Sequence, residues 1–225
     1  MVLYGNKLFN NKRGVVIHMK ITCIGHSGFL LELNSCNLIF DYFKDTCGVI
    51  TPEVLGKKTF VFVSHAHADH YSRKIFNFSE HGNVTYILES DCPIPKSAPQ
   101  GIIKMSEGEE ITLESGLVKV RAYGSTDIGV SFLVETEGFH IFHAGDLNCW
   151  YWEDESTPEE LEDDEKRYLN IINGIAGQKI DIAFIPEDPR LGKHSGRGIK
   201  QFQEIVAPAK IIPMHFPGNE GKVYK

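Results

Sequence analysis

A six-residue segment concentrates side chains that bind divalent metals. Its candidate ligands are His65, His67, Asp69 and His70, and they directly follow the apolar run Thr59–Ser64. Imidazole nitrogens and carboxylate oxygens are both ligands for zinc and for other divalent ions. A loop that leaves a rigid strand holds such ligands in place, whereas four polar groups buried together without partners would be costly. The segment therefore predicts a metal site.

Two later segments also run from an apolar strand pattern into a loop that carries a metal-binding side chain. The first is Ile141–Asp146, which ends in Gly-Asp, and the second is Ile211–Phe216, which contains His215. Alone, an aspartate after a glycine is common in turns, and a single histidine is weak evidence. Their order after the histidine-rich segment makes Asp146 and His215 candidate ligands.

The pattern His-x-His-x-Asp-His after an apolar strand resembles the signature of the metallo-β-lactamase superfamily. The resemblance extends from Met19 to about Gly218 and is strongest to small bacterial hydrolases related to the ascorbate-6-phosphate lactonases. It implies an α/β fold, the four-layer αββα sandwich, with one or two metals at the rim between the sheets. It further implies that Asp146 bridges two ions. The implied ligands are His65, His67 and Asp127 for the first ion, and Asp69, His70 and His215 for the second.

Asp127 enters this set because the chain departs from the family pattern. The family has a further histidine before Gly-Asp, but segment 123–129 contains none. Asp127 is the natural substitute, His143 and His194 are alternatives, and a first site with only two side-chain ligands plus the bridge stays open. Two divalent ions are expected, with zinc as the metal, although a carboxylate ligand would favour manganese or iron.

The expected activity is that of a metal-dependent hydrolase using a metal-bound hydroxide, because bound ions lower the pKa of water towards ~7. Asp69 and Asp146 are the predicted catalytic residues. The substrate is expected to be a small anionic ester, lactone or phosphodiester. His67 stands where flavodiiron oxygen reductases have glutamate, which favours hydrolysis. The alternatives are a ribonuclease or other nucleic-acid phosphodiesterase, and a metal-binding sensor without turnover.

Substrate-binding residues are sought in two segments beyond the metal ligands. Trp150 and Trp152 follow Asp146 closely and could form an aromatic wall or simply pack beneath the next helix. Arg190 follows a predicted strand and suits an anionic group, whereas His194 suits proton transfer near neutral pH. A solvated loop is the alternative for the basic residues of this segment.

Composition limits the partners and the compartment. The 225 residues carry a formal net charge of −7, which argues against nucleic acid as a partner because its binders present basic surfaces. Neither a membrane-spanning run nor a signal peptide is seen, so a cytoplasmic location is expected. The five cysteines form no Cys-x-x-Cys pair, which is typical of free thiols. A homo-oligomer is left open.

The elements that position these residues are predicted from periodicity and turn residues. Residues 1–18 are interpreted as a weakly ordered extension, or as an added edge strand at 15–17, and residues 19–225 as the hydrolase domain. Helices are expected at 72–78, 157–176 and 198–206. The second begins at Thr157, which forms a capping box with Glu160 and is followed by Pro158 at the first helical position. Strands are expected at 20–24, 29–33, 37–41, 59–64, 84–88, 102–105, 110–113, 117–122, 130–135, 139–143, 181–185 and 210–214.

Overall fold

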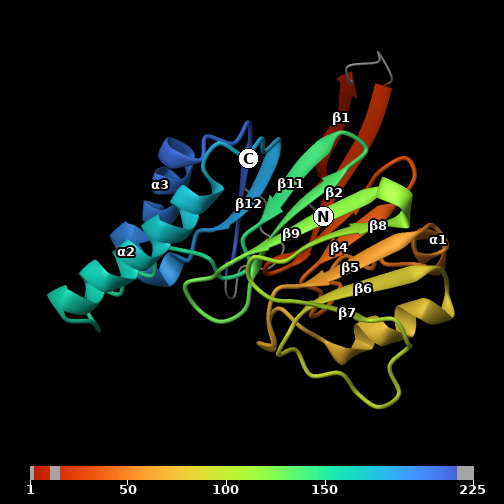
Figure 1. The fold of residues 1–225 in the computed structure, drawn as a ribbon, viewed down its shortest axis with the longest axis horizontal. Helices are drawn as coiled ribbons and strands as arrows, with labels where there is room; N and C mark the ends of the chain where they lie inside the picture. Colours follow the sequence, from red (N-terminus) through yellow and green to blue (C-terminus); the bar gives the residue numbers. More distant parts are fainter. Residues whose placement is uncertain (1–2, 11–15, 217–225) are drawn as a thin grey trace. The chain divides into compact units, whose positions relative to one another are not determined.

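Two mixed β-sheets form the framework of the chain, one in each half (Figure 1). The computed structural model describes residues 3–10 and 16–216. The described residues divide into a first unit that ends at Met105 and a second unit that begins at Ser106. Each sheet lies entirely within one unit.

The first unit contains a seven-stranded sheet in sequence order. Its first four strands are antiparallel neighbours, and the last four run parallel. A short helix, α1 (Pro52–Leu55), and a 3₁₀ helix, η1 (Arg73–Glu80), belong to the parallel half. The strands are β1 (Leu3–Asn10), β2 (Val16–Gly25), β3 (Gly28–Glu32), β4 (Asn37–Phe40), β5 (Thr59–Val63), β6 (Val84–Glu89) and β7 (Ile103–Met105).

Strand β5 is firmly packed within this sheet up to its carboxyl end. All five of its residues are buried, as expected for a strand with both faces covered. Val61 and Val63 belong to an apolar cluster that also contains Ile75 of η1. Phe62, on the alternate face, stacks on Phe40 of β4 with ring centroids 4.8 Å apart. The residues that follow β5 therefore start from a fixed position.

The second unit contains a six-stranded sheet in the order β13-β12-β11-β10-β9-β8. Strands β11, β12 and β13 are parallel, and the others are antiparallel. Two 3₁₀ helices, η2 (Glu114–Gly116) and η3 (Pro189–His194), lie in its loops. The strands are β8 (Glu110–Leu113), β9 (Val118–Tyr123), β10 (Ser131–Thr136), β11 (Phe139–His143), β12 (Ile182–Pro186) and β13 (Ile211–Met214).

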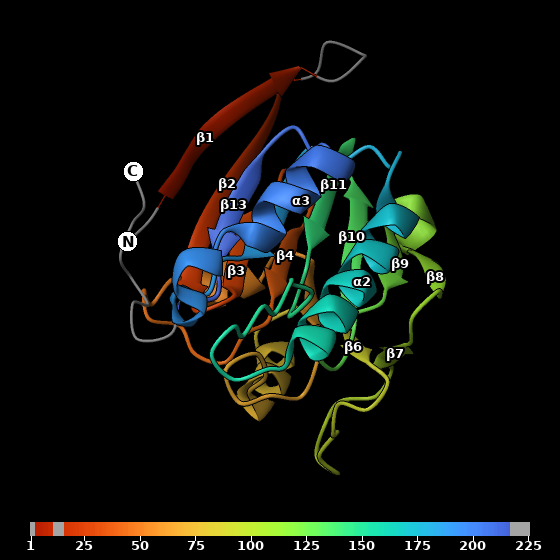
Figure 2. The same cartoon turned by 90° about the vertical axis from the view of Figure 1, so that its left-hand side faces the viewer.

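Two helices pack together in the second unit (Figures 1 and 2). Helix α3 (Arg197–Ile205) contacts α2 (Pro158–Ile175) as well as β12 and β13. The predicted capping box begins α2: Glu160 N donates to Thr157 Oγ1 at 3.3 Å, and Thr157 N donates to Glu160 Oε2 at 2.8 Å. This pair satisfies amide groups that the first turn would otherwise leave without partners.

The predicted strands from residue 20 onward all have counterparts, with ends shifted by a few residues. Three short elements were not predicted: α1, η2 and η3 are too short to show a periodic pattern. The helix predicted at 72–78 is the 3₁₀ helix η1.

The segment before Met19 differs from the predicted weakly ordered extension. Leu3–Asn10 forms β1, which pairs antiparallel with β2, and the predicted domain boundary falls inside β2. The alternative interpretation, an edge strand at 15–17, overlaps the start of β2 at residues 16 and 17. Strand β1 was not predicted, because backbone pairing with a neighbouring strand leaves little trace in the periodicity of an edge strand. Residues 1–2, 11–15 and 217–225 of the two predicted domains lie outside the described residues.

Candidate metal centre

The first cluster of polar side chains lies where parallel strands β4 and β5 end. Asp41 directly follows β4, and Ser64 directly follows β5. Because the carboxyl ends of parallel neighbours meet at one sheet edge, the two residues are adjacent. Asp41 N donates to Phe62 O at 2.9 Å, and Ser64 N donates to Asp41 Oδ1 at 2.7 Å. The strand pairing thus fixes the start of the histidine-rich segment.

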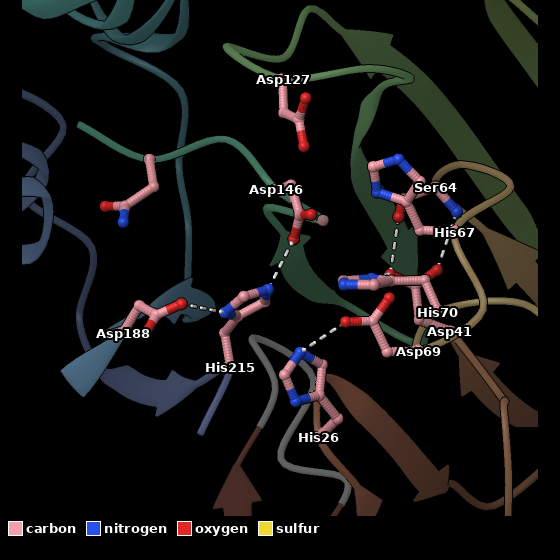
Figure 3. A network of polar contacts seen from close by, with 12 residues as sticks. His26, Asp41, Ser64, His67, Asp69, His70, Asp127, Asp146, Asp188 and His215 are labelled. Atoms are coloured by element: carbon pink, nitrogen blue, oxygen red, sulfur yellow. Dashed lines mark hydrogen bonds and ion pairs between the residues drawn. The ribbon is translucent and has the colours of Figure 1, made fainter. Parts of the chain in front are cut away.

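Asp41 and Ser64 orient two of the predicted ligands (Figure 3). The buried Asp41 Oδ2 accepts hydrogen bonds from Ser64 Oγ at 2.6 Å and from His70 Nδ1 at 2.8 Å. Ser64 Oγ in turn lies 2.9 Å from His65 Nδ1. An oxygen partner on Nδ1 fixes the tautomer and ring orientation of a histidine, so that Nε2 is the atom directed at a metal.

His67, Asp69 and His26 complete the first cluster. His65 Nε2 lies 3.1 Å from His67 Nδ1. Asp69 Oδ2 lies 3.4 Å from Nε2 of His26, which is located in the β2–β3 turn. Ligand atoms of His26, Asp69 and His70 all lie within 4.8 Å of one another. His67 and Asp69 are exposed while the other three histidines are buried, so the first unit offers a donor set that is partly open to solvent.

The second cluster lies where parallel strands β11, β12 and β13 end. Asp146 follows β11 by three residues, Asp188 follows β12 by two, and His215 directly follows β13. His215 Nδ1 donates to Asp188 Oδ2 at 3.0 Å, and His215 Nε2 lies 3.3 Å from Asp146 Oδ1 (Figure 3). All three side chains are buried. His215 therefore has the same arrangement as His65 and His70, with an oxygen partner on Nδ1.

Asp188 is a fully buried carboxylate with two side-chain partners, His215 and Arg190. Its oxygens accept from Arg190 Nε at 2.9 and 3.0 Å and from the Arg190 Nη2 atom, in a bidentate contact. Burial by itself would raise the pKa of Asp188, but the hydrogen bonds from His215 and Arg190 hold that pKa well below its usual range. Asp188 is consequently ionised and fixes His215 at neutral pH.

Three residues of these clusters have a strained backbone conformation. His26, Asp41 and His215 have φ values of 31°, 42° and 67°, in the left-handed region that non-glycine residues rarely occupy. Such conformations cost of order 1–3 kcal/mol and persist where the surrounding structure enforces them, commonly at functional sites. The strand ends are thus shaped to direct particular side chains.

Two tryptophans connect the second cluster to its surroundings. Trp150 Nε1 donates to Asp146 O at 3.0 Å, and the Trp150 ring meets His215 edge-on with centroids 5.4 Å apart. Trp152 lies parallel to Trp150, with centroids 6.1 Å apart, and Arg190 lies over Trp152 at 5.5 Å. Both predicted tryptophans therefore pack around the ligand-bearing loop.

A pocket of about 370 Å³ opens beside Trp152 and Arg190, between segments 151–155 and 190–194 of the second unit. At its rim Glu153 pairs with Lys193 Nζ at 2.6 Å and with His194 Nε2 at 3.2 Å. His194, a predicted substrate-binding residue, thus lies in this pocket and not among the groups of candidate metal ligands found in the described residues.

The sequence offers Asp127 as the substitute for the missing histidine of the first metal site. Asp127 is exposed and, like His143, belongs to none of the groups of three or more candidate ligands within the described residues. Its loop is nevertheless anchored: Thr126 Oγ1 donates to Asn148 O at 2.6 Å, and Arg167 donates to Thr126 O at 2.9 Å. The position of Asp127 is therefore set by the Asp146 loop and by α2.

Sequence reasoning missed four residues that the structure adds to the predicted ones. Asp41, Ser64 and Asp188 orient ligand histidines, and His26 contacts Asp69. Asp41 and Ser64 immediately follow a buried strand and Asp188 follows one by two residues, and this position at a strand end is the feature that could have indicated them. His26 stands in the short Gly-His-Ser-Gly turn between two predicted strands.

The donor set tests whether divalent metals fit these clusters. Three histidines have Nδ1 engaged by an oxygen, which is the arrangement seen around metal-bound imidazole. The set combines imidazole and carboxylate groups, which zinc and neighbouring transition metals accept as ligands. The residues present therefore fit divalent metal ions.

Comparison with known proteins identifies the family. Residues 20–162, more than half of the chain, match the family model described as a beta-lactamase superfamily domain. The chain belongs to this superfamily. It is 28% identical over 224 residues to a protein of Opitutus terrae and 26% identical over 219 residues to one of Korarchaeum cryptofilum, both named UPF0173 metal-dependent hydrolase. The alignments cover 89% and 91% of this chain, and 86% and 87% of those proteins.

Solved structures show the fold. A protein of Parabacteroides distasonis superimposes with a TM-score of 0.64 at 17% identity, covering 95% of this chain and 89% of that one. Igni18 of Ignicoccus hospitalis, described as a novel metallo hydrolase, gives a TM-score of 0.58 at 16% identity, covering 88% and 82%. The predicted metallo-β-lactamase fold is confirmed.

The predicted enzyme class is confirmed at the level of a metal-dependent hydrolase of this superfamily. Substrate, metal and ligand assignments stay predictions. Among the helices in the part of the chain that the structure covers, none is both long and apolar enough to cross a membrane.

Proposed function

We propose that this protein hydrolyses a small anionic ester, lactone or phosphodiester with two divalent metal ions, zinc being the expected metal. The observation that carries the proposal is the repeated support of histidines at strand ends: His65 by Ser64, His70 by Asp41 and His215 by Asp188. Such support is costly in strain and in buried charge, so it indicates a site that must keep its ligands in one orientation.

The ions would be held by residues of both clusters. In the proposal His65, His67 and Asp127 hold one ion, while Asp69, His70 and His215 hold the other and Asp146 serves both. Bound divalent ions supply a water of lowered pKa and stabilise negative charge that develops on oxygen.

Asp69 and His26 would act together on the nucleophile. Asp69 is exposed, and its Oδ2 atom lies 3.4 Å from His26 Nε2. In the proposal this carboxylate accepts a hydrogen bond from the attacking water and orients it. His26 is buried and restrains the carboxylate, which makes it a positioning residue.

The pocket beside Trp152 would take the part of the substrate that is not cleaved. Its volume of about 370 Å³ is at the lower end for small-molecule sites. Trp152 lines the pocket with Trp150 stacked on it from outside the lining, and Arg190 and His194 provide polar groups. Arg190 already neutralises Asp188, so in the proposal it meets an anionic substrate group with its exposed edge (the side chain is 55% exposed).

The test uses protein stripped by a chelator and then reloaded with zinc, manganese or iron(II). Each form is assayed on p-nitrophenyl acetate, a γ-lactone and bis(p-nitrophenyl) phosphate. The proposal expects turnover of at least one class that disappears on stripping, returns on reloading and is lost in Asp146→Ala. Fully loaded protein that turns over none of the three classes would overturn it.

A matched control separates the site from general damage. Asp181 directly precedes β12 and accepts a hydrogen bond from His140 Nδ1 at 3.2 Å. Asp181→Asn therefore alters an aspartate–histidine contact that lies outside both clusters. Asp181→Asn is expected to keep metal content and turnover.

Cleavage of RNA that weakens steeply with salt would instead favour a nucleic-acid substrate.

A further inference from the structure

Two of the five cysteines differ from the others in exposure and lie close together. Cys23, on β2, and Cys47, in the loop after β4, are half-buried, whereas Cys36, Cys92 and Cys149 are buried. The Cys47 thiol donates to Cys23 O at 3.4 Å. The pair belongs to the first unit and is not used by the proposed reaction.

The loop that carries Cys47 is fixed against β2 by backbone and side-chain contacts. Thr46 donates to Ile24 O through both its N and its Oγ1, each at 2.9 Å. Asp45 accepts from Cys47 N at 3.0 Å and from Ile50 N at 2.7 Å. Cys47 is therefore held beside Cys23 in the native state.

The contact sets an upper limit on the separation of the two Cα atoms. A carbonyl oxygen lies ~2.4 Å from its own Cα, so the 3.4 Å contact keeps the two Cα atoms within roughly 9 Å. Disulfides need a Cα separation of about 4.4–6.8 Å. Cα atoms more than about 7 Å apart cannot be bridged without backbone movement, so at such a separation the bridge requires a shift of the loop that carries Cys47 as well as new side-chain rotamers.

We propose that Cys23 and Cys47 form a redox-active dithiol, which a low-molecular-weight disulfide oxidises to an intramolecular disulfide. The Cys47 thiolate attacks one sulfur of the oxidant, forming a mixed disulfide and releasing one small thiol. Cys23 then loses its proton and attacks Cys47 Sγ, and the second small thiol leaves. Two protein thiols are oxidised and one oxidant disulfide is reduced to two thiols, so electrons and protons balance.

Burial of the other cysteines makes the reaction selective. Burial raises the pKa of Cys92 to about 12 and that of Cys149 to about 11, and the thiolate is the reactive form. Burial and the nearby Cys47 thiol also raise the pKa of Cys23, which disfavours its attack on the free oxidant. Its attack in the second step is intramolecular and depends on the short distance to Cys47.

The cross-link would lie next to a residue of the first cluster. Phe43, in the same loop, approaches Gly25 so closely that an added Cβ there would lie 3.0 Å from its ring, and it meets the His26 ring edge-on with centroids 6.4 Å apart. Joining Cys23 to Cys47 therefore restrains the turn that carries His26. Formation of the disulfide itself does not depend on the proposed hydrolase activity.

The test exposes the full-length protein to graded ratios of oxidised to reduced glutathione. Alkylation and non-reducing trypsin digestion follow, with mass spectrometry of the peptides. Trypsin places Cys47 in Asp45–Lys57 but places both Cys23 and Cys36 in Ile21–Lys44. The proposal expects these two peptides to be linked, the link to persist in Cys36→Ser, and reduction to restore five reactive thiols after denaturation.

Two further outcomes decide against the proposal. One is a link from Cys47 to Cys36, detected by fragment-ion sequencing of the wild-type peptide, which also serves if Cys36→Ser does not fold. The other is a stable glutathione adduct on Cys47 without any cross-link in the wild type. In Cys23→Ser, by contrast, that adduct is the expected product.

Discussion

Asp188 Oδ2 lies 3.0 Å from His215 Nδ1, and the same carboxylate is held by Arg190 in a bidentate contact. This buried contact joins the ends of two neighbouring parallel strands, β12 and β13. It gives His215 a single tautomer and one orientation before any ligand arrives.

Asp188→Asn removes the negative charge that holds His215 and is expected to weaken zinc binding by about 10- to 100-fold, the usual effect of altering the oxygen partner of a ligand histidine. Chelator competition monitored at constant pH measures the change. Asp181→Asn, which removes the contact to His140, should bind zinc like the wild type. Equal affinities in all three proteins would show that Asp188 does not act through the metal.

Asp41→Asn tests the first cluster through stability. The Asp41 carboxylate accepts from Ser64 N, Ser64 Oγ and His70 Nδ1 while almost fully buried. An amide can satisfy only part of this set, so urea unfolding of metal-free protein should show a loss of about 2–4 kcal/mol. Ser64→Ala removes one donor and should cost about 1 kcal/mol. A larger loss in Ser64→Ala than in Asp41→Asn would refute the assigned role of Asp41.

Alkaline pH should destabilise the folded chain. Burial raises the pKa of Cys92 from 9.0 to about 12, so between these values the unfolded chain is ionised and the folded chain is not. The unfolded state then binds fewer protons, and stability falls as pH rises, by at most about 1.4 kcal/mol per pH unit for this group. Unfolding free energies measured in reductant from pH 8.5 to 11 should fall less steeply in Cys92→Ala. Parallel slopes would contradict the raised pKa.

Gly82 and Gly174 form a matched pair for backbone packing. A Cβ on Gly82 would lie 1.8 Å from Leu55 O, whereas one on Gly174, in α2, would meet nothing within 4 Å. Gly82→Ala should destabilise the fold by about 3 kcal/mol, and Gly174→Ala should stabilise it by about 0.5–1 kcal/mol. Thermal unfolding compares them, and a neutral Gly82→Ala would show that the segment relaxes freely.

Local patterns were sufficient for most of the strands and for the histidine-rich segment. The run Thr59–Val63 is buried along its whole length, and Thr157 and Glu160 form their capping box within four residues. Both features depend on neighbours in the sequence, so composition and spacing could reveal them.

The supporting side chains of the clusters could not be found in this way. Asp41 lies 29 residues from His70, and Asp188 lies 27 residues from His215. Their contacts depend on which strands pair in parallel, and a strand pattern does not specify its partner. His26 likewise reaches Asp69 only because β2 and β3 turn back at Gly25 and Gly28.

We propose that this chain binds two metal ions, and its metal content decides between two ions and fewer. Protein purified without added metal, and the same protein after reloading with zinc and gel filtration, are analysed by plasma mass spectrometry. We expect about two ions per chain after reloading, with a large loss in Asp146→Ala and a partial loss in Asp127→Ala. Wild-type protein that retains less than about one ion after reloading, or an Asp146→Ala variant that retains the full content, would contradict it.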